Sequence, residues 1–542
     1  MTRKKDNLYE LVHSLSPAEK RYFKLFVGAD GKQGNKYLEL FDLLAKQKAY
    51  EEDKLLRLPT YRGHANRLQV AKNYLFQLIL KYLRSNRKNS TPELEVLELL
   101  LDIQSLYQRR LWPAARRLTD KARKIAEEND YYDLRFTIGE WERRLVAVSA
   151  DPQHYGDSYE AILDRETYVA QQLELNAFYF NRYKKMRFIN LREGYIKRGR
   201  ALDEFMSCLK HPHLQDFSYA TNPTAQLYFY LCYIEYFYAM RDHEYRYQIN
   251  WRLMAHFAKH PVLQRNHPET YLRSLVAYLL NLLDLGRWTA FNRDIEILGQ
   301  LELPAYAHHL QRLRAFEYLH LRMYEHYAQG RFEEAVAEYV PQVLAYYDQH
   351  DHQLIFLDEL LLKLEVGWIY IGVGELEKAI EWVVPLEMQI DPKLFADSFT
   401  AHCIILMMVH YELGDAKTMR AVAERMRDFL QSRRKMSSPE AFIIDFFLSA
   451  SEDLGNKSRQ RELLQNFRSE LAVLRRYLYV VPVYPIENII WWVDSRVSQR
   501  TLAEVVRDRH RELEGNREEF IRRARIEFPG YTDIELPNFG EE

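Results

Sequence analysis

Histidine clusters are the residues of this sequence best suited to metal chemistry. His256 and His260 lie one helical turn apart in "MAHFAKHP", and His350, Asp351 and His352 are adjacent in "YDQHDHQL". Each pair of histidines could hold a metal only weakly, because two donors without a third do not make a site. We therefore expect surface or helix-end histidines and predict no bound metal.

Phosphate-binding and catalytic motifs are also missing from the sequence. The loop "GADGKQGNKY" at residues 28–37 has no Ser or Thr after its Gly-Lys pair, which a phosphate loop requires. There is no GxGxxG, HExxH, GxSxG or paired CxxC motif. We therefore predict no cofactor and no enzymatic activity.

Composition narrows the class of protein further. The 542 residues are 47% apolar and 28% charged, which is ordinary for a folded, water-exposed chain. The longest apolar runs, such as "CIILMMV", are far shorter than the roughly 20 residues that span a bilayer. Three widely spaced cysteines favour a reducing compartment. We expect a cytoplasmic protein without a membrane segment.

The elements that must position any binding residues are helices joined by regularly spaced turns. Apolar residues recur every three to four positions on both sides of each turn, which is helical spacing. Glycine at the turn can adopt the left-handed conformation that ends a helix. A small residue five positions later lets two helices approach closely. Nine predicted turns are spaced 40 to 46 residues apart, at Arg110, Gly156, Gly199, Asp242, Gly286, Gly330, Gly374, Gly414 and Gly455.

These turns resemble those of the tetratricopeptide repeat (TPR) family, over about residues 94–470. The best unit is Gly367, Tyr370, Gly374 and Ala379, which matches the glycine, aromatic, turn and small-residue positions of the family. The period is longer than the usual figure of about 34 residues, so longer helices are expected. The resemblance implies an all-α, right-handed superhelix (α-solenoid) of about nine hairpins, with a concave face that binds a protein or peptide.

Regions of different composition predict four parts of the chain. They are a basic helical N-terminal domain at 1–90, the TPR-like α-solenoid at 91–470, capping helices at 471–528 and an extended or disordered tail at 529–542. Residues 1–90 carry 19 basic and 9 acidic side chains, a net charge of +10, and we expect four or five helices there. Residues 301–400 carry 7 basic and 17 acidic side chains, a net charge of −10. One hypothesis is that this acidic segment folds back on the basic N-terminal domain or pairs with it in a homodimer.

The last helix predicted in the N-terminal domain has the composition of a helix that enters the major groove of DNA. Basic and amide side chains crowd its first turns. The alternatives are a helical cap whose cations are solvated and a basic face that docks a protein. The region also resembles the front end of bacterial regulators that join a DNA-binding domain to TPR-like repeats. The candidate nucleic-acid contacts are Arg62, Asn66, Arg67, Lys72 and Asn73.

A second basic helix lies inside the predicted repeats. The stretch "NRYKKMRFINLREGYIKRGR" carries eight basic residues and one acidic residue, with tyrosines between them. As a first helix of a pair it would line the concave face. An ordinary charged helix is the alternative. The candidate contacts to an acidic peptide or partner are Arg182, Lys185, Arg187, Asn190, Arg192 and Tyr195.

The sequence therefore predicts a non-enzymatic, cytoplasmic scaffold that binds a protein or peptide on a TPR-like superhelix. The alternative function is a regulator with a nucleic-acid-binding N-terminal domain and a TPR-like sensor domain.

Overall fold

All regular elements in the described part of the chain are helices, and no strand is among them, which confirms the predicted all-α class. The computed structural model describes residues 6–511, apart from 29–33, 48–49, 58–59, 63, 86–90, 149–151, 194–199, 241, 305–306, 351–355, 433–437 and 479–485. The chain divides into two compact units, residues 1–101 and 102–542. The division falls inside a helix that begins after the predicted boundary at residue 90.

Unit 1 is built around a small apolar core of its own. Ser16 starts the second helix as predicted: its hydroxyl accepts from the Glu19 backbone N–H, and the Glu19 carboxylate accepts from the Ser16 backbone N–H. Phe23, Phe41 and Leu75 are completely buried in this core. Four or five helices were predicted, and the described part of the unit contains five before α6: α1 (Asn7–Ser14), α2 (Pro17–Gly28), α3 (Gly34–Lys46), α4 (Glu52–Leu56) and α5 (Ala65–Ser85).

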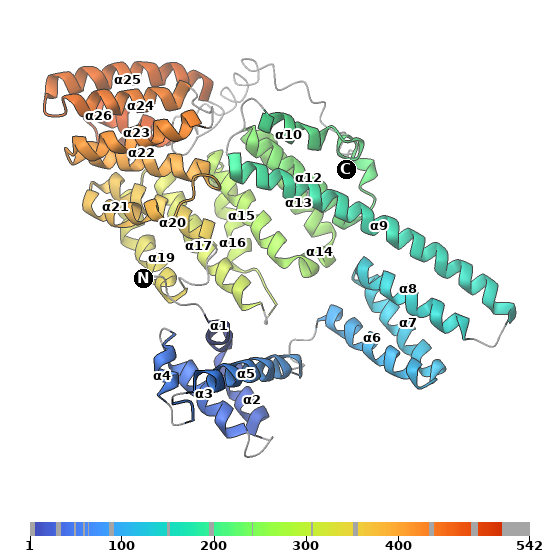
Figure 1. Ribbon diagram of the computed structural model, residues 1–542. Coiled ribbons are helices and arrows are strands. Elements are labelled where there is room, and N and C mark those ends of the chain that lie inside the picture. The colour runs from blue at the N-terminus through green and yellow to red at the C-terminus, as the bar shows by residue number, and fades with distance from the viewer. Residues whose placement is uncertain are drawn as a thin grey trace. The chain divides into compact units, whose positions relative to one another are not determined.

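The first half of unit 2 contains one unusually long helix among ordinary hairpins (Figure 1). The helices here are α6 (Pro92–Gln108), which crosses the unit boundary, α7 (Trp112–Glu128), α8 (Tyr132–Ala147), α9 (Pro152–Glu193), α10 (Arg200–Leu209), α11 (Pro212–Gln215), η2 (Phe217–Tyr219), α12 (Pro223–Ala239), α13 (His243–Lys259), α14 (Pro261–Asn266), α15 (Pro268–Asp284) and α16 (Trp288–Gly299).

The second half of unit 2 continues the hairpins and contains one π-helical stretch, η3. Its elements are α17 (His308–Ala328), α18 (Phe332–Glu334), η3 (Ala335–Tyr339), α19 (Val340–His350), α20 (Phe356–Val373), α21 (Leu376–Val383), η5 (Val384–Met388), α22 (Ala396–Glu412), α23 (Ala416–Ser432), α24 (Ser438–Glu452), α25 (Lys457–Leu478) and α26 (Ile486–Ser498), followed by a helical segment at 502–511.

Successive helices pair as hairpins, and the first helices of neighbouring pairs also pack together. α12 packs on α13, α15 on α16, α20 on α21 and α22 on α23. Between pairs, α15 packs on α17, α20 on α22, and α22 on α24. Figure 1 shows these hairpins following one another along the unit. Each amphipathic helix therefore buries its apolar stripe against neighbours on two sides.

The turn residues account for the hairpins in physical terms. Four predicted turn glycines, Gly286, Gly330, Gly374 and Gly414, have positive φ values between 63° and 84°. Arg110 also has φ 60°, although it is not glycine. Where the best TPR-like unit was predicted, a side chain at Gly367 would collide with Val383 of α21. Glycine at this position lets α20 and α21 approach closely.

The other four predicted turns differ in outcome. The prediction of a turn at Gly156 is wrong, because Gly156 lies inside α9. Asp242 and Gly455 do lie between helices, and Gly199 is outside the described residues. A further left-handed turn lies at Asp130, where φ is 53° between α7 and α8.

The C-terminal helices do more than cover the last hairpin. α26 packs on α25, and Asn488 at its start accepts a hydrogen bond from the Tyr327 hydroxyl of α17 at 2.5 Å. Further along, His510 stacks on Trp288 of α16 with ring centroids 4.6 Å apart. The predicted cap thus returns to hairpins far earlier in the chain. Its predicted start at 471 lies inside α25, and 512–528 and the predicted tail lie outside the described residues.

Candidate functional site

The predicted partner-binding residues lie on α9, a single helix of 42 residues. α9 packs on α8 and also on α12, so it belongs to two successive layers of helices (Figure 1). At 1.5 Å per residue it is roughly 60 Å long. Tyr195, the last predicted contact, lies outside the described residues.

Arg187 and Asn190 both bind Glu235 of the neighbouring helix α12. The Arg187 Nη1 group donates to Glu235 Oε1 at 3.1 Å, and Asn190 Nδ2 donates to Glu235 Oε2 at 2.7 Å. Asn190 Nδ2 also donates to the Glu235 backbone carbonyl at 2.9 Å. Burial alone would lower the pKa of Arg187, but the Glu235 charge outweighs burial and raises it. These side chains hold α9 against α12.

The other predicted cations of α9 also contact the chain itself. Lys185 and Arg192 lie 3.6 Å and 3.4 Å from carboxylate oxygens of Glu204 on α10. The guanidinium of Arg182 lies over the Phe178 ring, 5.3 Å from its centroid. The structure therefore does not bring the predicted residues together as one set of free cations around a peptide carboxylate.

A different set of α9 residues forms an exposed stripe that the sequence reasoning did not single out. Phe180, Phe188 and Leu191 are 38%, 53% and 37% exposed. With Lys184 they have the spacing i, i+4, i+8 and i+11, which places them on one face of a helix. This spacing is visible in the sequence and could have identified these four residues as one face. We call Phe180, Lys184, Phe188 and Leu191 the α9 stripe.

Cations lie directly on the aromatic rings of the α9 stripe. The Lys184 ammonium is 5.3 Å from the Phe180 centroid, and Arg192 is 5.6 Å from that of Phe188. Burial, and then the charge of nearby Arg187, lower the pKa of Lys184. An incoming carboxylate would relieve this repulsion between the two cations. The stripe can therefore offer both apolar contact and positive charge.

Buried charges connect the first helices further along unit 2. His320 of α17 lies between two carboxylates, 3.1 Å from Glu317 and 2.6 Å from Glu365 of α20. Burial would lower the pKa of His320, but the two glutamates outweigh it and raise that pKa well above its ordinary value. The imidazolium thus acts as an ionic bridge between α17 and α20.

Asp358 belongs to the same buried network. Its Oδ2 atom lies 3.7 Å from the Arg273 guanidinium of α15. Burial, and then the charge of Glu317, raise the pKa of Asp358 to about 6. The network sets three acids, Glu317, Asp358 and Glu365, against two bases, Arg273 and His320, so one acid can stay protonated without leaving a base unpaired.

The predicted nucleic-acid residues divide into two groups on α5 and the turn before it. Arg62, Asn66, Arg67 and Asn73 are exposed. Lys72, in contrast, is buried: its ammonium forms an ion pair with Asp6 and donates to the Tyr50 hydroxyl at 2.7 Å. Burial would lower the pKa of Lys72, but hydrogen bonds to Asp6 and Tyr50 outweigh it and raise the pKa. Lys72 thus does not fit the prediction of a phosphate contact.

The exposed face of α5 is long and carries no negative charge. None of its 21 residues is acidic. Tyr74, 48% exposed, stacks on Tyr37 of α3 with centroids 4.3 Å apart, and Val70 is 69% exposed. The polar residues exposed on this face are Asn66, Arg67, Gln69, Asn73, Gln77, Lys81 and Arg84.

The histidines considered as metal ligands have other contacts. His256 Nε2 lies 2.9 Å from the Pro223 carbonyl oxygen, and its ring lies 4.7 Å from that of His260. Residues 351–352 of the second cluster lie outside the described residues. Among the residues that the structure describes, no group of three or more His, Cys, Asp or Glu is placed to hold a metal ion. No helix in the same part of the chain is long and apolar enough to cross a membrane.

Comparisons with known proteins gave no relative for this chain. No family model matches it, and no curated protein or solved structure is similar to it.

Proposed function

We propose that this protein is a non-enzymatic scaffold whose paired helices form a TPR-like superhelix and whose α9 stripe binds a partner protein or peptide. The observation that carries this proposal is the exposure of Phe180 and Phe188 on one face of α9, each covered by a cation. Exposed aromatic residues beside basic ones are typical of protein-binding hot spots. The free, buried thiols of Cys208, Cys232 and Cys403 fit the proposed cytoplasmic location.

The chemistry of the stripe defines the partner. Two phenylalanines and a leucine favour apolar anchors spaced along a helix or an extended peptide. The Lys184 ammonium favours acidic residues between those anchors, because opposite charges steer association and suppress wrong partners. The partner segment should therefore combine Leu, Ile or Phe with Asp or Glu.

A peptide selection tests this proposal. A phage-displayed random peptide library is selected on the full chain, and the enriched peptides are measured by fluorescence anisotropy. We expect acidic, apolar peptides whose affinity falls at least tenfold in the double variant Phe180→Ala, Phe188→Ala. The matched control is Phe136→Ala, which removes a phenylalanine that is 42% exposed on α8. Enriched peptides that bind the double variant as tightly as the original chain would refute the proposal.

A second candidate function is a regulator whose unit 1 binds nucleic acid. The observation that favours it is the exposed α5 face, on which Arg67, Lys81 and Arg84 occur with four amide side chains and no acid. Arginine and amide groups are the side chains that read base edges, while cations contact phosphates. Unit 2 would then serve as the sensor that binds the partner.

Duplex DNA binding across a salt series tests this second candidate. We expect binding by the full chain that weakens steeply with salt and is lost when Arg67 and Lys81 are replaced by Glu. The control is Lys124→Glu on α7, whose side chain is 78% exposed. If the chain does not bind duplex DNA at low salt, this candidate fails and the scaffold proposal is unaffected.

A further inference from the structure

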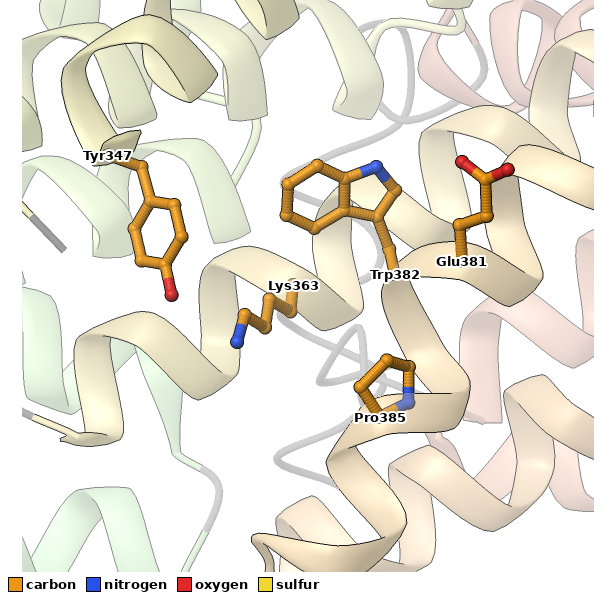
Figure 2. Close-up of a pocket in the computed structure, with 5 residues that line it drawn as sticks. All are labelled: Tyr347, Lys363, Glu381, Trp382 and Pro385. Atoms are coloured by element: carbon orange, nitrogen blue, oxygen red, sulfur yellow. The ribbon is translucent and has the colours of Figure 1, made fainter. Parts of the chain in front are cut away.

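A small open pocket is lined by four consecutive elements of unit 2. Its volume is about 330 Å³, and its lining residues come from α19, α20, α21 and η5: Tyr347, Lys363, Glu381, Trp382 and Pro385. Figure 2 shows the Tyr347 ring and the Trp382 indole on opposite sides, with the Lys363 side chain between them. The pocket uses none of the residues of the α9 stripe.

Lys363 contributes a lysine ammonium to this pocket. The residue is only 9% exposed, and its ammonium donates to Glu359 Oε1 at 2.5 Å. The Tyr347 hydroxyl donates to the same oxygen at 2.6 Å, so the hydroxyl points at Glu359. A lysine ammonium has three donors, and Glu359 takes one of them. The ammonium keeps two further N–H groups beyond this bond, and it lies 5.5 Å from the centroid of the Tyr347 ring.

The charges around the pocket favour a neutral ligand. Glu359 already balances the positive charge of Lys363, and Glu381 adds an exposed carboxylate at the rim. A cationic ligand would meet the Lys363 ammonium between the rings, whereas an anionic ligand would meet Glu381 without gaining a free cation. The best ligand group is therefore uncharged and rich in hydrogen-bond acceptors.

The aromatic walls define the shape of that ligand. The half-buried Trp382 and Tyr347 rings offer flat apolar surfaces, and the Trp382 indole N–H adds another donor. On η5, next to Pro385, Val384 and Met388 are 39% and 96% exposed, which extends the apolar surface beyond the pocket. A ligand longer than the pocket could thus continue along η5.

We propose that this pocket binds a proline-rich, extended segment of a partner protein in the polyproline II conformation. Such a segment offers backbone carbonyls as acceptors, and its proline residues bring no N–H that would need a partner. Its rings and aliphatic side chains pack against aromatic walls, as in other grooves that recognise proline-rich segments. Because the segment is already extended before binding, little conformational entropy is lost.

Binding of labelled decaproline to the full chain tests this proposal, with a glycine-serine decapeptide as the negative probe. We expect decaproline binding in fluorescence anisotropy. Its affinity should change less than twofold between 0.05 and 0.5 M salt, because the proline residues are uncharged and Glu359 already balances the charge of Lys363. Trp382→Ala should weaken binding at least tenfold, whereas Tyr347→Phe, which keeps the ring, should weaken it less than threefold. Trp251→Ala, at a tryptophan 56% exposed on α13, is the matched control.

Three results would overturn the proposal. They are no decaproline binding up to 1 mM, equal binding of the glycine-serine peptide, or unchanged decaproline binding by Trp382→Ala. A thermal melt by circular dichroism, identical for Trp382→Ala and the original chain, establishes that any lost binding is local to the pocket.

Discussion

Trp492 donates its indole N–H to Glu412 Oε1 over 2.6 Å, although 80 residues separate them in the chain. The indole is completely buried, and the same glutamate lies 2.6 Å from the Arg496 guanidinium. This contact ties α26 to the end of α22. A buried hydrogen bond to a charged group is among the stronger single polar contacts in a protein.

Trp492→Phe should therefore destabilise unit 2 while keeping the aromatic packing. We expect a loss of about 2 kcal/mol in the free energy of unfolding, because the donor to Glu412 disappears but Arg496 still binds that carboxylate. Urea unfolding followed by circular dichroism measures it. Trp251→Phe, at an exposed tryptophan, is the control and should change stability by less than about 0.5 kcal/mol.

Gly330→Ala should be more costly than the same change at another turn glycine. Gly330 has φ +71°, and a β-carbon there would stand 2.7 Å from the Ala503 carbonyl oxygen. Gly414 has φ +74° but open space around it. Gly414→Ala should cost about 1–2 kcal/mol from backbone strain alone. Gly330→Ala should cost more and also displace residues 502–511, which limited trypsin cleavage after Arg507 would detect. Equal stability of the two variants would contradict the close approach.

Stability should fall as pH rises, because of the buried network around Asp358. Its pKa of about 6 in the folded protein lies above its ordinary value of 3.8, so folding favours the protonated form. That contribution is complete below pH 3.8 and is lost as pH rises through 6, about 3 kcal/mol in all. The raised pKa of His320 acts in the same direction, because its stabilising charge is also lost at higher pH.

Asp358→Asn isolates the aspartate part of this pH dependence. The variant cannot ionise, so the free energy of unfolding should change less between pH 4 and pH 7 than in the original chain. Arg273, Glu317, His320 and Glu365 are unchanged in the variant, which keeps the histidine contribution present. Identical pH profiles of the two proteins, measured by urea unfolding, would show that Asp358 titrates at its ordinary pKa.

Lys72→Ala should unfold unit 1 rather than selectively weaken any binding of nucleic acid. The Lys72 side chain is 7% exposed, and its removal leaves the Asp6 carboxylate, which is 13% exposed, without its cation. Breaking such a buried pair costs about 3–5 kcal/mol. Lys81→Ala, on the exposed face of the same helix, should change stability by less than about 0.5 kcal/mol. Thermal melts of both variants separate the structural role of Lys72 from the surface role of Lys81.

Local features of the fold could be predicted from the sequence because they depend on few neighbouring residues. The helix start at Ser16 and the left-handed turns at Gly286, Gly330, Gly374 and Gly414 require only short-range geometry. The error at Gly156 has the same origin. A glycine costs only about 1 kcal/mol inside a helix, which the packing of α9 on α8 and α12 outweighs.

The sequence located the candidate surfaces, but it could not predict which of their cations remain exposed. Helical spacing alone identified α9 and α5 as basic helices, but Glu235 lies 48 residues from Arg187 in the chain, and nothing local reveals their ion pair. Lys72 was assigned to the exposed face for a similar reason, since its partner Asp6 precedes α1, far from Lys72 in the sequence. Which cations remain exposed is decided by tertiary packing, and it leaves Lys184 on the surface beside Phe180.

The return of the C-terminal helices has a consequence for synthesis on the ribosome. Arrays of helical hairpins can fold progressively, since each hairpin contacts only its neighbours. Here the Tyr327 hydroxyl binds Asn488, which is synthesised 161 residues later, and the turn at Gly330 packs against the later residue Ala503. The central hairpins thus emerge from the ribosome well before their last contacts exist. A truncated or stalled chain would leave exposed the apolar surface that the C-terminal helices normally cover. Such a chain would be a substrate for chaperones and proteases.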